Sequence, residues 1–359
     1  MAASTATTFT IPETMKRLVV TSFGATVKES KIEIQTDVPV PKPASDEILI
    51  KMVAAAVNPS DYGKWKGSNN NSDEPLAMGL EGSGIVVATG GGLMTKRVKI
   101  GDKVAVVGPT KKQGTYSEYI VMAATEGIFS LGDKIPVEDA ASYFVNPFTA
   151  IAILDTAKNA GAKALVHTAA ASQLGQMMVK LTKSEGANAM KIINVVRREE
   201  QATLLKELGA EHVVVTSEDN WKETLKAKVE ELQATVAFDA VAGEQAGDIL
   251  TALPKKGTLF IYGALGGTVS GIDPIQLIYQ EKQVKGFLLT PWVKAGGLLM
   301  SVPRMVVAGR KVNAGLLTNG GWSSSQFKDT TMEKLQSDVV ELLENKATGQ
   351  KMRLRMDVV

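Results

Sequence analysis

The chain has 359 residues, 44% hydrophobic and 22% charged, the composition of a globular protein long enough for two domains. Its formal net charge of +2 and the lack of any apolar run of ~20 residues give no reason to expect a nucleic-acid or membrane partner. The absence of cysteine excludes disulfide bonds, a thiolate nucleophile and a thiolate-bound metal.

Residues 1–14 are rich in alanine and threonine and contain no arginine. They lack the basic start and apolar core of a secretory signal, so we expect a flexible leader, with a weak organelle-targeting leader as the alternative. A cytoplasmic location is the default prediction.

The first third of the chain has the pattern of a β domain. Short β-rich runs are separated by glycine and proline, which predicts a small barrel-like or folded-sheet domain. The expected strands are Leu18–Thr21, Glu47–Val57, Gly84–Thr89, Lys103–Val107 and Glu118–Met122.

Helical patterns begin after Pro136, and from Lys163 strands alternate with helices. The expected strands are Ala164–His167, Lys191–Val196, His212–Thr216, Thr235–Asp239, Thr258–Tyr262 and Val284–Leu289. The expected helices are Leu174–Glu185, Glu199–Leu208, Trp221–Leu232 and Ala246–Leu253. This alternation predicts a parallel sheet covered by helices on both faces.

The tail differs again. Leu298–Ala308 and Met332–Asn345 have helical patterns, and Met352–Val358 has the pattern of a closing strand. The basic residues from Lys351 to Arg355 alternate with apolar ones, which predicts a strand with one face in water. The tail is too short to fold alone, so we expect it to pack on the first domain.

The most informative segment is Ala164–Gly175, a strand followed by a turn of small residues and the start of a helix. A helix N-terminus offers unpaired N–H groups and partial positive charge, and small side chains let a diphosphate approach them. We therefore expect a dinucleotide site here. The alternative is a purely structural helix start capped by Ser172.

The residue at the end of the second strand of this unit distinguishes NAD from NADP. An acidic residue there would bind the ribose 2′-hydroxyl of NAD and repel the 2′-phosphate of NADP. Here Val196 is followed by Arg197 and Arg198, and guanidinium groups suit a 2′-phosphate. We predict NADPH as the cofactor. The alternative is that both arginines are solvated charges that pair with Glu199 and Glu200.

Six short motifs occur in the order found in one large family. They are Val57-Asn-Pro-Ser-Asp61, Gly79-Leu-Glu-Gly-Ser-Gly-Ile-Val86, Ile100-Gly-Asp-Lys-Val104, Gly114-Thr-Tyr-Ser-Glu-Tyr119, Leu205-Lys-Glu-Leu-Gly-Ala210 and Phe238-Asp-Ala-Val-Ala-Gly243. Together they resemble the medium-chain dehydrogenase/reductase superfamily over almost the whole chain. The resemblance implies an α/β fold: a GroES-like β-rich catalytic domain (15–149), a doubly wound Rossmann domain (150–291) and a C-terminal return to the catalytic domain (292–359).

The resemblance also bears on metal. Zinc-dependent members have a histidine where this chain has Leu80, and their cysteines are missing here. His167 and His212 fall on or beside expected strands of the Rossmann domain, so we expect structural roles for them. The chain resembles the zinc-free quinone oxidoreductase and enoyl reductase branch, and no metal is expected.

Further cofactor contacts follow from the resemblance and from the carboxyl edge of the sheet, where ligands of such folds bind. The expected set is Asn146, Thr149, Ala170, Ser172, Gln173, Leu174, Arg197, Arg198, Tyr262, Gly263, Ala264, Leu288, Leu289 and Thr290.

A zinc-free nicotinamide site suits reduction of a C=C bond conjugated to a carbonyl, or of a quinone. Such a small-molecule substrate needs a hydrogen-bond donor for the developing enolate and a proton for the α-carbon. Asn58, Tyr62 and Lys64 are the candidates. The alternative for Tyr62 is an aromatic side chain that packs on the barrel. Related enoyl reductases have a catalytic tyrosine just past a glycine, but Ser68 and Asn69 follow Gly67 here.

Two further expectations come from the resemblance. A non-catalytic NADPH-binding or structural protein of the same fold is the alternative function. A homodimer formed through the Rossmann sheet edge, at 284–289, is the expected assembly.

Overall fold

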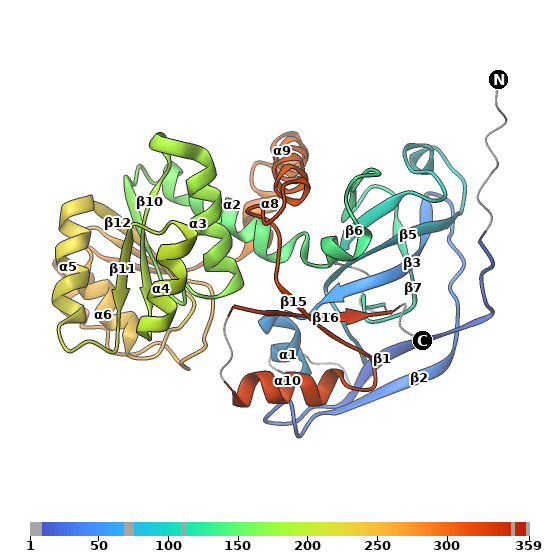
Figure 1. Ribbon diagram of the computed structural model, residues 1–359, viewed down its shortest axis with the longest axis horizontal. Helices are drawn as coiled ribbons and strands as arrows, with labels where there is room; N and C mark the ends of the chain where they lie inside the picture. The colour runs from blue at the N-terminus through green and yellow to red at the C-terminus, as the bar shows by residue number, and fades with distance from the viewer. Residues whose placement is uncertain (1–8, 68–74, 109–112, 346–348, 357–359) are drawn as a thin grey trace. The chain divides into compact units, whose positions relative to one another are not determined.

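The computed structural model describes residues 9–67, 75–108, 113–345 and 349–356. The chain divides into two compact units. The β-rich unit contains residues 1–145, 316–319 and 324–359, and the parallel-sheet unit contains residues 146–315 and 320–323. Figure 1 shows the elements of both units.

Among the described residues, two sheets make up the β-rich unit. The smaller, antiparallel sheet has the order β2 (Lys31–Pro39), β1 (Thr14–Ser22), β4 (Leu76–Ala77). The larger has the order β15 (Phe327–Thr330), β16 (Lys351–Arg355), β3 (Glu47–Ala56), β5 (Glu81–Thr89), β6 (Lys103–Val107), β8 (Ile128–Ser130), and β7 (Tyr119–Ala123) also pairs with β3.

The tail completes this unit. β16 pairs antiparallel with β3, and α10 (Leu335–Glu344) packs beside α1 (Pro59–Trp65). One core cluster joins Trp65 of α1, Leu335 and Val339 of α10 and Leu354 of β16. The C-terminal residues therefore supply both a strand and a helix that the N-terminal part lacks.

In the described part of the second unit, the parallel sheet has the order β11 (His212–Val215), β10 (Lys191–Val196), β9 (Ala164–His167), β12 (Ala234–Asp239), β13 (Thr258–Ile261), β14 (Gln283–Gly286). The order reverses between β9 and β12, as in doubly wound nucleotide-binding folds. The helices are α2 (Val145–Asn159), α3 (Gln173–Glu185), α4 (Glu199–Leu208), α5 (Trp221–Leu232), α6 (Gln245–Ala252), α7 (Pro274–Ile278), α8 (Leu289–Lys294) and α9 (Gly297–Leu317).

Helices cover both faces of this sheet. Val179 of α3 and Leu205 of α4 pack with Val196 on one face. Leu225 of α5 and Ile249 of α6 pack with the strands on the other face. The expected α/β class, with a Rossmann sheet and a GroES-like β-rich domain, is confirmed. Among the described helices, none is long and apolar enough to cross a bilayer.

Several elements differ from the sequence expectations, and two of the differences affect how the sheets are built. β2 was not expected, because its apolar residues alternate with charges and it lies at the edge of the small sheet. The last parallel strand ends at Gly286, so Leu289 and Thr290 begin helix α8 instead of following a strand directly.

The return to the β-rich unit begins at Leu316, later than the expected 292. All but the last two residues of helix α9 (Gly297–Leu317) belong to the parallel-sheet unit. Val312 is fully buried there, its carbonyl accepts a hydrogen bond from Ser323 Oγ at 2.8 Å, and Gly315 packs closely against Trp322.

Candidate cofactor and catalytic sites

In the turn after β9, backbone segments approach so closely that position 175 has no room for a side chain. Ala169 has a left-handed φ of 49°, which turns the chain out of the strand. A Cβ on Gly175 would lie 2.0 Å from the carbonyl oxygen of Ala170. The helix can therefore start this close to the turn only because position 175 is glycine, as the phosphate-binding interpretation requires.

Ser172 caps the helix that follows. Its hydroxyl accepts a hydrogen bond from the N–H of Gly175 at 3.3 Å. The capping alternative is thus present in the structure, and it leaves the first-turn N–H of Leu174 without a partner inside the helix. Ala170 is buried beneath the turn, and Gln173 and Leu174 are also buried. A phosphate role for this turn remains a proposal that the geometry allows.

Asp239, the last residue of β12, forms hydrogen bonds with residues in the loops after β9 and β12. Its Oδ1 accepts hydrogen bonds from the Thr168 hydroxyl at 2.5 Å and the Val241 N–H at 2.8 Å. Its Oδ2 accepts from the Ala242 N–H at 3.0 Å, and the Thr168 hydroxyl accepts from the Ala240 N–H at 2.9 Å. This fully buried carboxylate shapes the carboxyl edge of the sheet, where ligands of such folds bind.

His167 lies at the same edge, and its Nε2 is 2.7 Å from the Tyr262 hydroxyl. Burial lowers the pKa of His167 to about 4, so its ring is neutral at physiological pH. Burial also raises the pKa of Tyr262, so its hydroxyl keeps its proton. His167 thus has the structural role that the sequence suggested, as a neutral partner that orients Tyr262.

The two arginines follow β10 directly. The backbone N–H groups of Arg197 and Arg198 donate to Gln201 Oε1 at 3.0 and 3.1 Å, which fixes the start of α4. Both side chains are exposed. Arg198 Nε lies 3.9 Å from Glu200 Oε2, so this arginine has the acidic partner considered above. The Arg197 guanidinium pairs with no other described residue.

The other expected cofactor residues lie in the parallel-sheet unit. Asn146 and Thr149 are half-buried, one turn apart on α2. A Cβ on Gly263 would lie 2.7 Å from the Ala240 carbonyl oxygen, so the loops after β12 and β13 approach closely there. The remaining residues differ in exposure: Leu289 is half-buried, and Ala264, Leu288 and Thr290 are exposed.

In the β-rich unit, Asn58 is fully buried just before α1. Its Nδ2 donates to Glu81 Oε1 at 3.0 Å, and its Oδ1 accepts a hydrogen bond from Lys351 Nζ. Both ends of the amide are therefore engaged, and one of its two N–H groups is used by Glu81. The role of Asn58 as a donor to substrate stays a prediction.

Glu81, the partner of Asn58, makes further hydrogen bonds to the backbone. Its Oε2 accepts hydrogen bonds from the N–H groups of Phe144 and Val145, both at 2.9 Å. Lys351, with only 5% of its surface exposed, faces the carboxylates of Glu81 and Asp61. Burial lowers the pKa of Lys351, and the two negative charges oppose that shift. We call Asn58, Asp61, Glu81 and Lys351 the buried polar network.

Tyr62 stands next to this network on α1 and is half-buried. Its ring packs edge-on against Trp65, with centroids 6.4 Å apart. Burial and the charge of Asp61 raise the pKa of Tyr62 to about 12, so its hydroxyl keeps its proton at neutral pH and can act as a donor. Lys64, by contrast, is exposed in the last turn of α1 and outside the network.

Burial raises the pKa of Asp61 from 3.8 to about 6. A carboxyl group whose pKa is higher in the folded state stabilises the fold below its unfolded pKa, and this contribution is lost as pH rises through the folded pKa. We expect wild type to lose about 3 kcal/mol relative to Asp61→Asn between pH 4 and pH 7. Urea unfolding of both proteins at several pH values measures this difference.

The effect of His167 on stability has the opposite pH dependence, because its pKa is lowered in the folded state. Its contribution to the free energy of unfolding is complete above pH 6.5 and is lost as pH falls toward 4. His167 contributes equally to wild type and to Asp61→Asn, so the difference between their two profiles of unfolding free energy against pH reports Asp61. A constant difference between the two proteins across this pH range would contradict the expectation for Asp61.

Three residues that organise these sites were missed from the sequence. Glu81 and Asp239 lie inside motifs quoted above, so the motifs could have indicated that these two residues matter. The motifs did not predict which hydrogen bonds the two carboxylates form. Lys351 gave no such signal. Its position predicted a solvated charge, whereas the pairing of β16 with β3 buries it beside a residue 293 positions away.

The comparisons with known proteins agree with this geometry. Residues 44–133 match the family described as alcohol dehydrogenase GroES-like domain, and residues 173–295 match the one described as zinc-binding dehydrogenase. The mitochondrial enoyl-[acyl-carrier-protein] reductase of Xenopus tropicalis is 31% identical over 265 residues, covering 72% of this chain and 73% of that protein. The chain belongs to the zinc-free branch of the medium-chain dehydrogenase/reductase superfamily.

Other members of the superfamily match to a similar degree. The bovine mitochondrial enoyl-[acyl-carrier-protein] reductase is 31% identical over 254 residues, which are 69% of this chain and 66% of that protein. A crystal structure from Mesorhizobium loti, assigned as an NADPH:quinone reductase, is 31% identical, with a TM-score of 0.81 and coverage of 97% of this chain and 100% of that one. The Escherichia coli quinone oxidoreductase complexed with NADPH is 22% identical, with a TM-score of 0.79 and coverage of 95% and 99%, and shares the fold.

One of the matched families is named for zinc. Among the described residues, no three His, Cys, Asp or Glu side chains gather where a metal ion could be held. The match to this family lies in the parallel-sheet unit and supports the nucleotide-binding fold, not a ligand set for zinc.

Proposed function

We propose that this protein is an NADPH-dependent reductase that transfers hydride to an activated C=C bond, in an alkenal, enone or enoyl thioester, or to a quinone. The observation that carries the proposal is the turn at 168–175. It brings a helix N-terminus and bare backbone together in a chain of this superfamily, and two arginines follow the next strand. A dinucleotide diphosphate suits this turn, because the start of α3 presents backbone N–H groups to an anion and the small side chains beside it let phosphates approach.

NADPH, when bound, supplies the hydride. In this chain, Arg197 holds the 2′-phosphate, because its exposed guanidinium stands where the ribose of an adenine dinucleotide ends in such folds. His167 and Asp239 hold Tyr262 and the surrounding loops in place. Tyr62 donates a hydrogen bond to the substrate carbonyl oxygen, because its hydroxyl remains protonated at neutral pH.

Arg197→Ala tests the cofactor assignment. We expect the KM for NADPH to rise about tenfold to a hundredfold and the KM for NADH to change less than about threefold, since only NADPH has the 2′-phosphate. Steady-state kinetics with both cofactors measure this. Lys206→Ala, which removes an exposed cation from α4 nearby in the sequence, is the matched control. Equal effects of Arg197→Ala on both cofactors would exclude the phosphate contact.

The activity itself is tested by NADPH oxidation with an acrolein-type enal, a quinone and crotonyl-CoA, with NADH as control. Turnover of at least one substrate is expected, and Tyr62→Phe should lower kcat without changing the Kd for NADPH. If NADPH binds but no substrate in the panel is consumed, the alternative of a non-catalytic NADPH-binding protein is favoured. The sequences of the relatives support both enoyl and quinone substrates.

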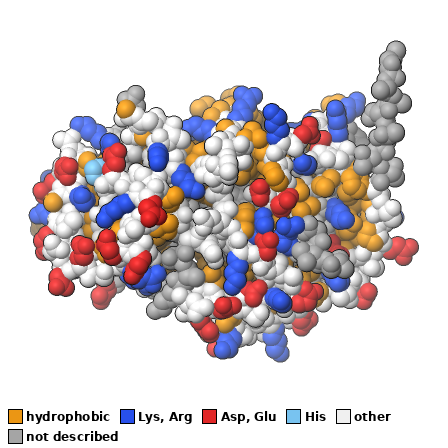
Figure 2. All heavy atoms as spheres, viewed as in Figure 1, with side chains coloured by type: hydrophobic (Ala, Val, Ile, Leu, Met, Phe, Trp, Pro, Cys, Tyr) orange, Lys and Arg blue, Asp and Glu red, His pale blue; other side chains and the backbone are white. Residues whose placement is uncertain are grey.

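We propose further that the protein forms a homodimer through the β14 edge of the parallel sheet. Every residue of β14 is exposed, and α9 carries exposed apolar side chains, among them Leu298 and Leu299 (82% and 88% exposed). Figure 2 shows hydrophobic side chains gathered over α9. Exposed apolar side chains clustered on one helix, as on α9, are typical of protein–protein contacts.

Val284→Asp and Leu299→Asp should each convert a dimer into a monomer in sedimentation velocity, because a buried unpaired carboxylate at the contact costs several kcal/mol. Lys285→Glu, on the same strand, changes only an exposed charge and is the milder control. A wild-type protein that sediments as a monomer at micromolar concentration would refute the dimer.

A cytoplasmic location is also a proposal, because several relatives are named as mitochondrial enzymes. The leader expected at 1–14 lies mostly outside the described residues, which begin at residue 9. Fusing residues 1–14 to a fluorescent protein tests it. Diffuse fluorescence is expected, and accumulation in an organelle would establish the targeting alternative.

A further inference from the structure

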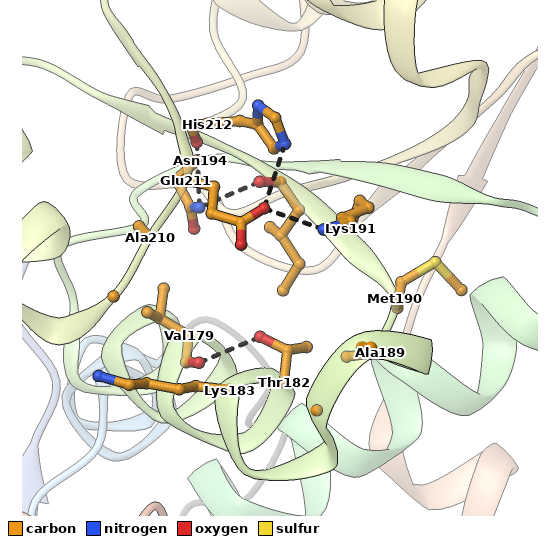
Figure 3. A pocket seen from close by; sticks show the side chains of 14 residues that line it. Val179, Thr182, Lys183, Ala189, Met190, Lys191, Asn194, Ala210, Glu211 and His212 are labelled. Carbon is orange, nitrogen blue, oxygen red and sulfur yellow. Dashed lines mark hydrogen bonds and ion pairs between the residues drawn. The ribbon is translucent and has the colours of Figure 1, made fainter.

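A cavity lies in the parallel-sheet unit, at the amino end of β10 and β11 and the C-terminal ends of α3 and α4. Its volume is ≈ 290 Å³ (Figure 3). The turn at 168–175 follows the carboxyl end of β9, at the opposite edge of the same sheet. The cavity, which we call the α3–β10 pocket, is therefore separate from the proposed NADPH site.

Asn194 is a polar exception on an otherwise apolar strand. The side chain of Asn194 is on the same face of β10 as Val196, two residues later, which packs under α3 and α4. Only 2% of the Asn194 surface is exposed, and the residues between Ile192 and Val196 are otherwise isoleucine and valine. A parallel strand covered on both faces normally has only apolar residues there.

The orientation of this amide is fixed by its neighbours. Nδ2 donates to the carbonyl oxygens of Ile192 and His212, both at 3.2 Å. Because both partners are acceptors, the nitrogen must face them and the oxygen must face away. Asn194 Oδ1 is buried and has no hydrogen-bond partner among the described residues. Leaving an acceptor unsatisfied costs free energy, so the site calls for a donor.

The pocket supplies further acceptors and an apolar wall. The Thr182 hydroxyl donates to the α3 carbonyls of Met178 and Val179, both at 3.0 Å, so its oxygen can still accept a hydrogen bond. Val179 and Met190 are apolar lining residues, and both are buried. The interior of the pocket therefore suits a compact apolar body that carries an N–H or O–H group.

The rim supplies donors. Lys183 lies in the last turn of α3, with its stem against Gly209, and its ammonium group pairs with no other described residue. Across the pocket, Lys191 is paired with Glu211 at 2.9 Å (Figure 3). The helix C-termini at this end carry partial negative charge, which offsets the lysines, so the pocket as a whole favours a neutral ligand over an anion.

We propose that the α3–β10 pocket binds a small neutral molecule with an apolar body and a primary amide or similar group, whose N–H donates to Asn194 Oδ1 and whose carbonyl oxygen accepts from Lys183. The inference does not rest on the proposed reductase activity. It concerns a different edge of the sheet and predicts binding with or without NADPH.

Benzamide is the probe, and two related ligands test the need for the N–H donor and for a neutral group. Titration followed by NMR of the methyl groups, in the presence of saturating NADPH and in its absence, should give a Kd on the order of 1 mM or tighter for benzamide. The signals of Met190 and Val179 should shift. N,N-dimethylbenzamide lacks the N–H donor and benzoate lacks it and is charged, so each should bind at least about tenfold more weakly.

Asn194→Leu removes the acceptor with a side chain of similar size, and should weaken benzamide binding about tenfold while leaving the methyl signals at the other edge of the sheet unchanged. Those signals also report that the unit is folded. Lys183→Gln should weaken binding less, and Lys226→Gln, an exposed lysine on α5, should have no effect. Should Asn194→Leu fail to fold, Thr182→Val, which removes the second acceptor and is expected to weaken binding about threefold, replaces it.

The proposal is overturned if benzamide binds wild type with a Kd much weaker than 1 mM, or if the dimethyl analogue binds equally well. Equal binding to Asn194→Leu, or shifts confined to residues at the other edge of the sheet, would also place the ligand elsewhere.

Discussion

Lys351→Met is expected to lower the free energy of unfolding by about 3–5 kcal/mol, the usual cost of removing one partner from a buried ionic network. The ammonium group donates to Asn58 Oδ1 and faces the carboxylates of Glu81 and Asp61 within a part of the β-rich unit that excludes water. Methionine fills the volume but leaves the Glu81 carboxylate buried without a counter-charge. Urea unfolding at pH 7 measures the change.

A functional effect should accompany the structural one. Asn58 and Asp61 begin α1, and Tyr62 lies on that helix, so disturbing the network displaces the proposed hydroxyl donor. We expect kcat to fall more than the Kd for NADPH rises, because the cofactor turn is in the other unit. Lys351 would then be a positioning residue.

Two variants separate this expectation from a general effect of losing a lysine. Lys328→Met removes an exposed lysine that pairs with Glu341 at the surface, and should cost less than about 0.5 kcal/mol. Adding Glu81→Gln to Lys351→Met should restore part of the lost stability, because it removes the unpaired charge. If Lys351→Met is no more destabilising than Lys328→Met, the network contributes no stability.

Gly175→Ala should weaken NADPH binding at least about tenfold and destabilise the parallel-sheet unit by about 3 kcal/mol. The added Cβ would lie 2.0 Å from the Ala170 carbonyl oxygen, and that atom belongs to backbone that cannot rotate away. Either the turn or the start of α3 must shift. Fluorescence titration of NADPH, together with thermal unfolding, measures both effects.

Gly286→Ala is the matched control, because a Cβ at that position meets nothing within 4 Å. It should leave both NADPH affinity and the melting temperature nearly unchanged. Unaltered NADPH binding by Gly175→Ala would show that the cofactor does not use this turn.

The elements of the parallel-sheet unit were predictable because local and global preferences agree there. β9 and β10 are short apolar runs that are almost entirely buried, and each is followed by a helix with apolar residues at helical spacing. β9, β10, α4 and α5 have the bounds expected from the sequence. The turn proposed to bind the diphosphate was equally local, since Gly175 and Ala170 are five residues apart.

The buried polar network was not predictable in the same way. The closing strand contains Lys351, Arg353 and Arg355 at alternate positions, and the pattern indicated that all three face water. Arg353 does reach Asp329 at 2.6 Å, but Lys351 is enclosed by partners from Asn58 and Glu81. Periodicity describes a strand and its two faces, but it does not say what covers either face.

The sequence by itself determined the doubly wound sheet, the β-rich domain, the tight turn for a dinucleotide and the lack of thiol chemistry, because each depends on residues close together in the chain or on composition. Only the tertiary structure decided which polar groups lose water. Asn58, Lys351 and Asn194 became buried because distant strands and helices closed over them, and the free energy of a polar group depends on those neighbours more than on its own place in the chain.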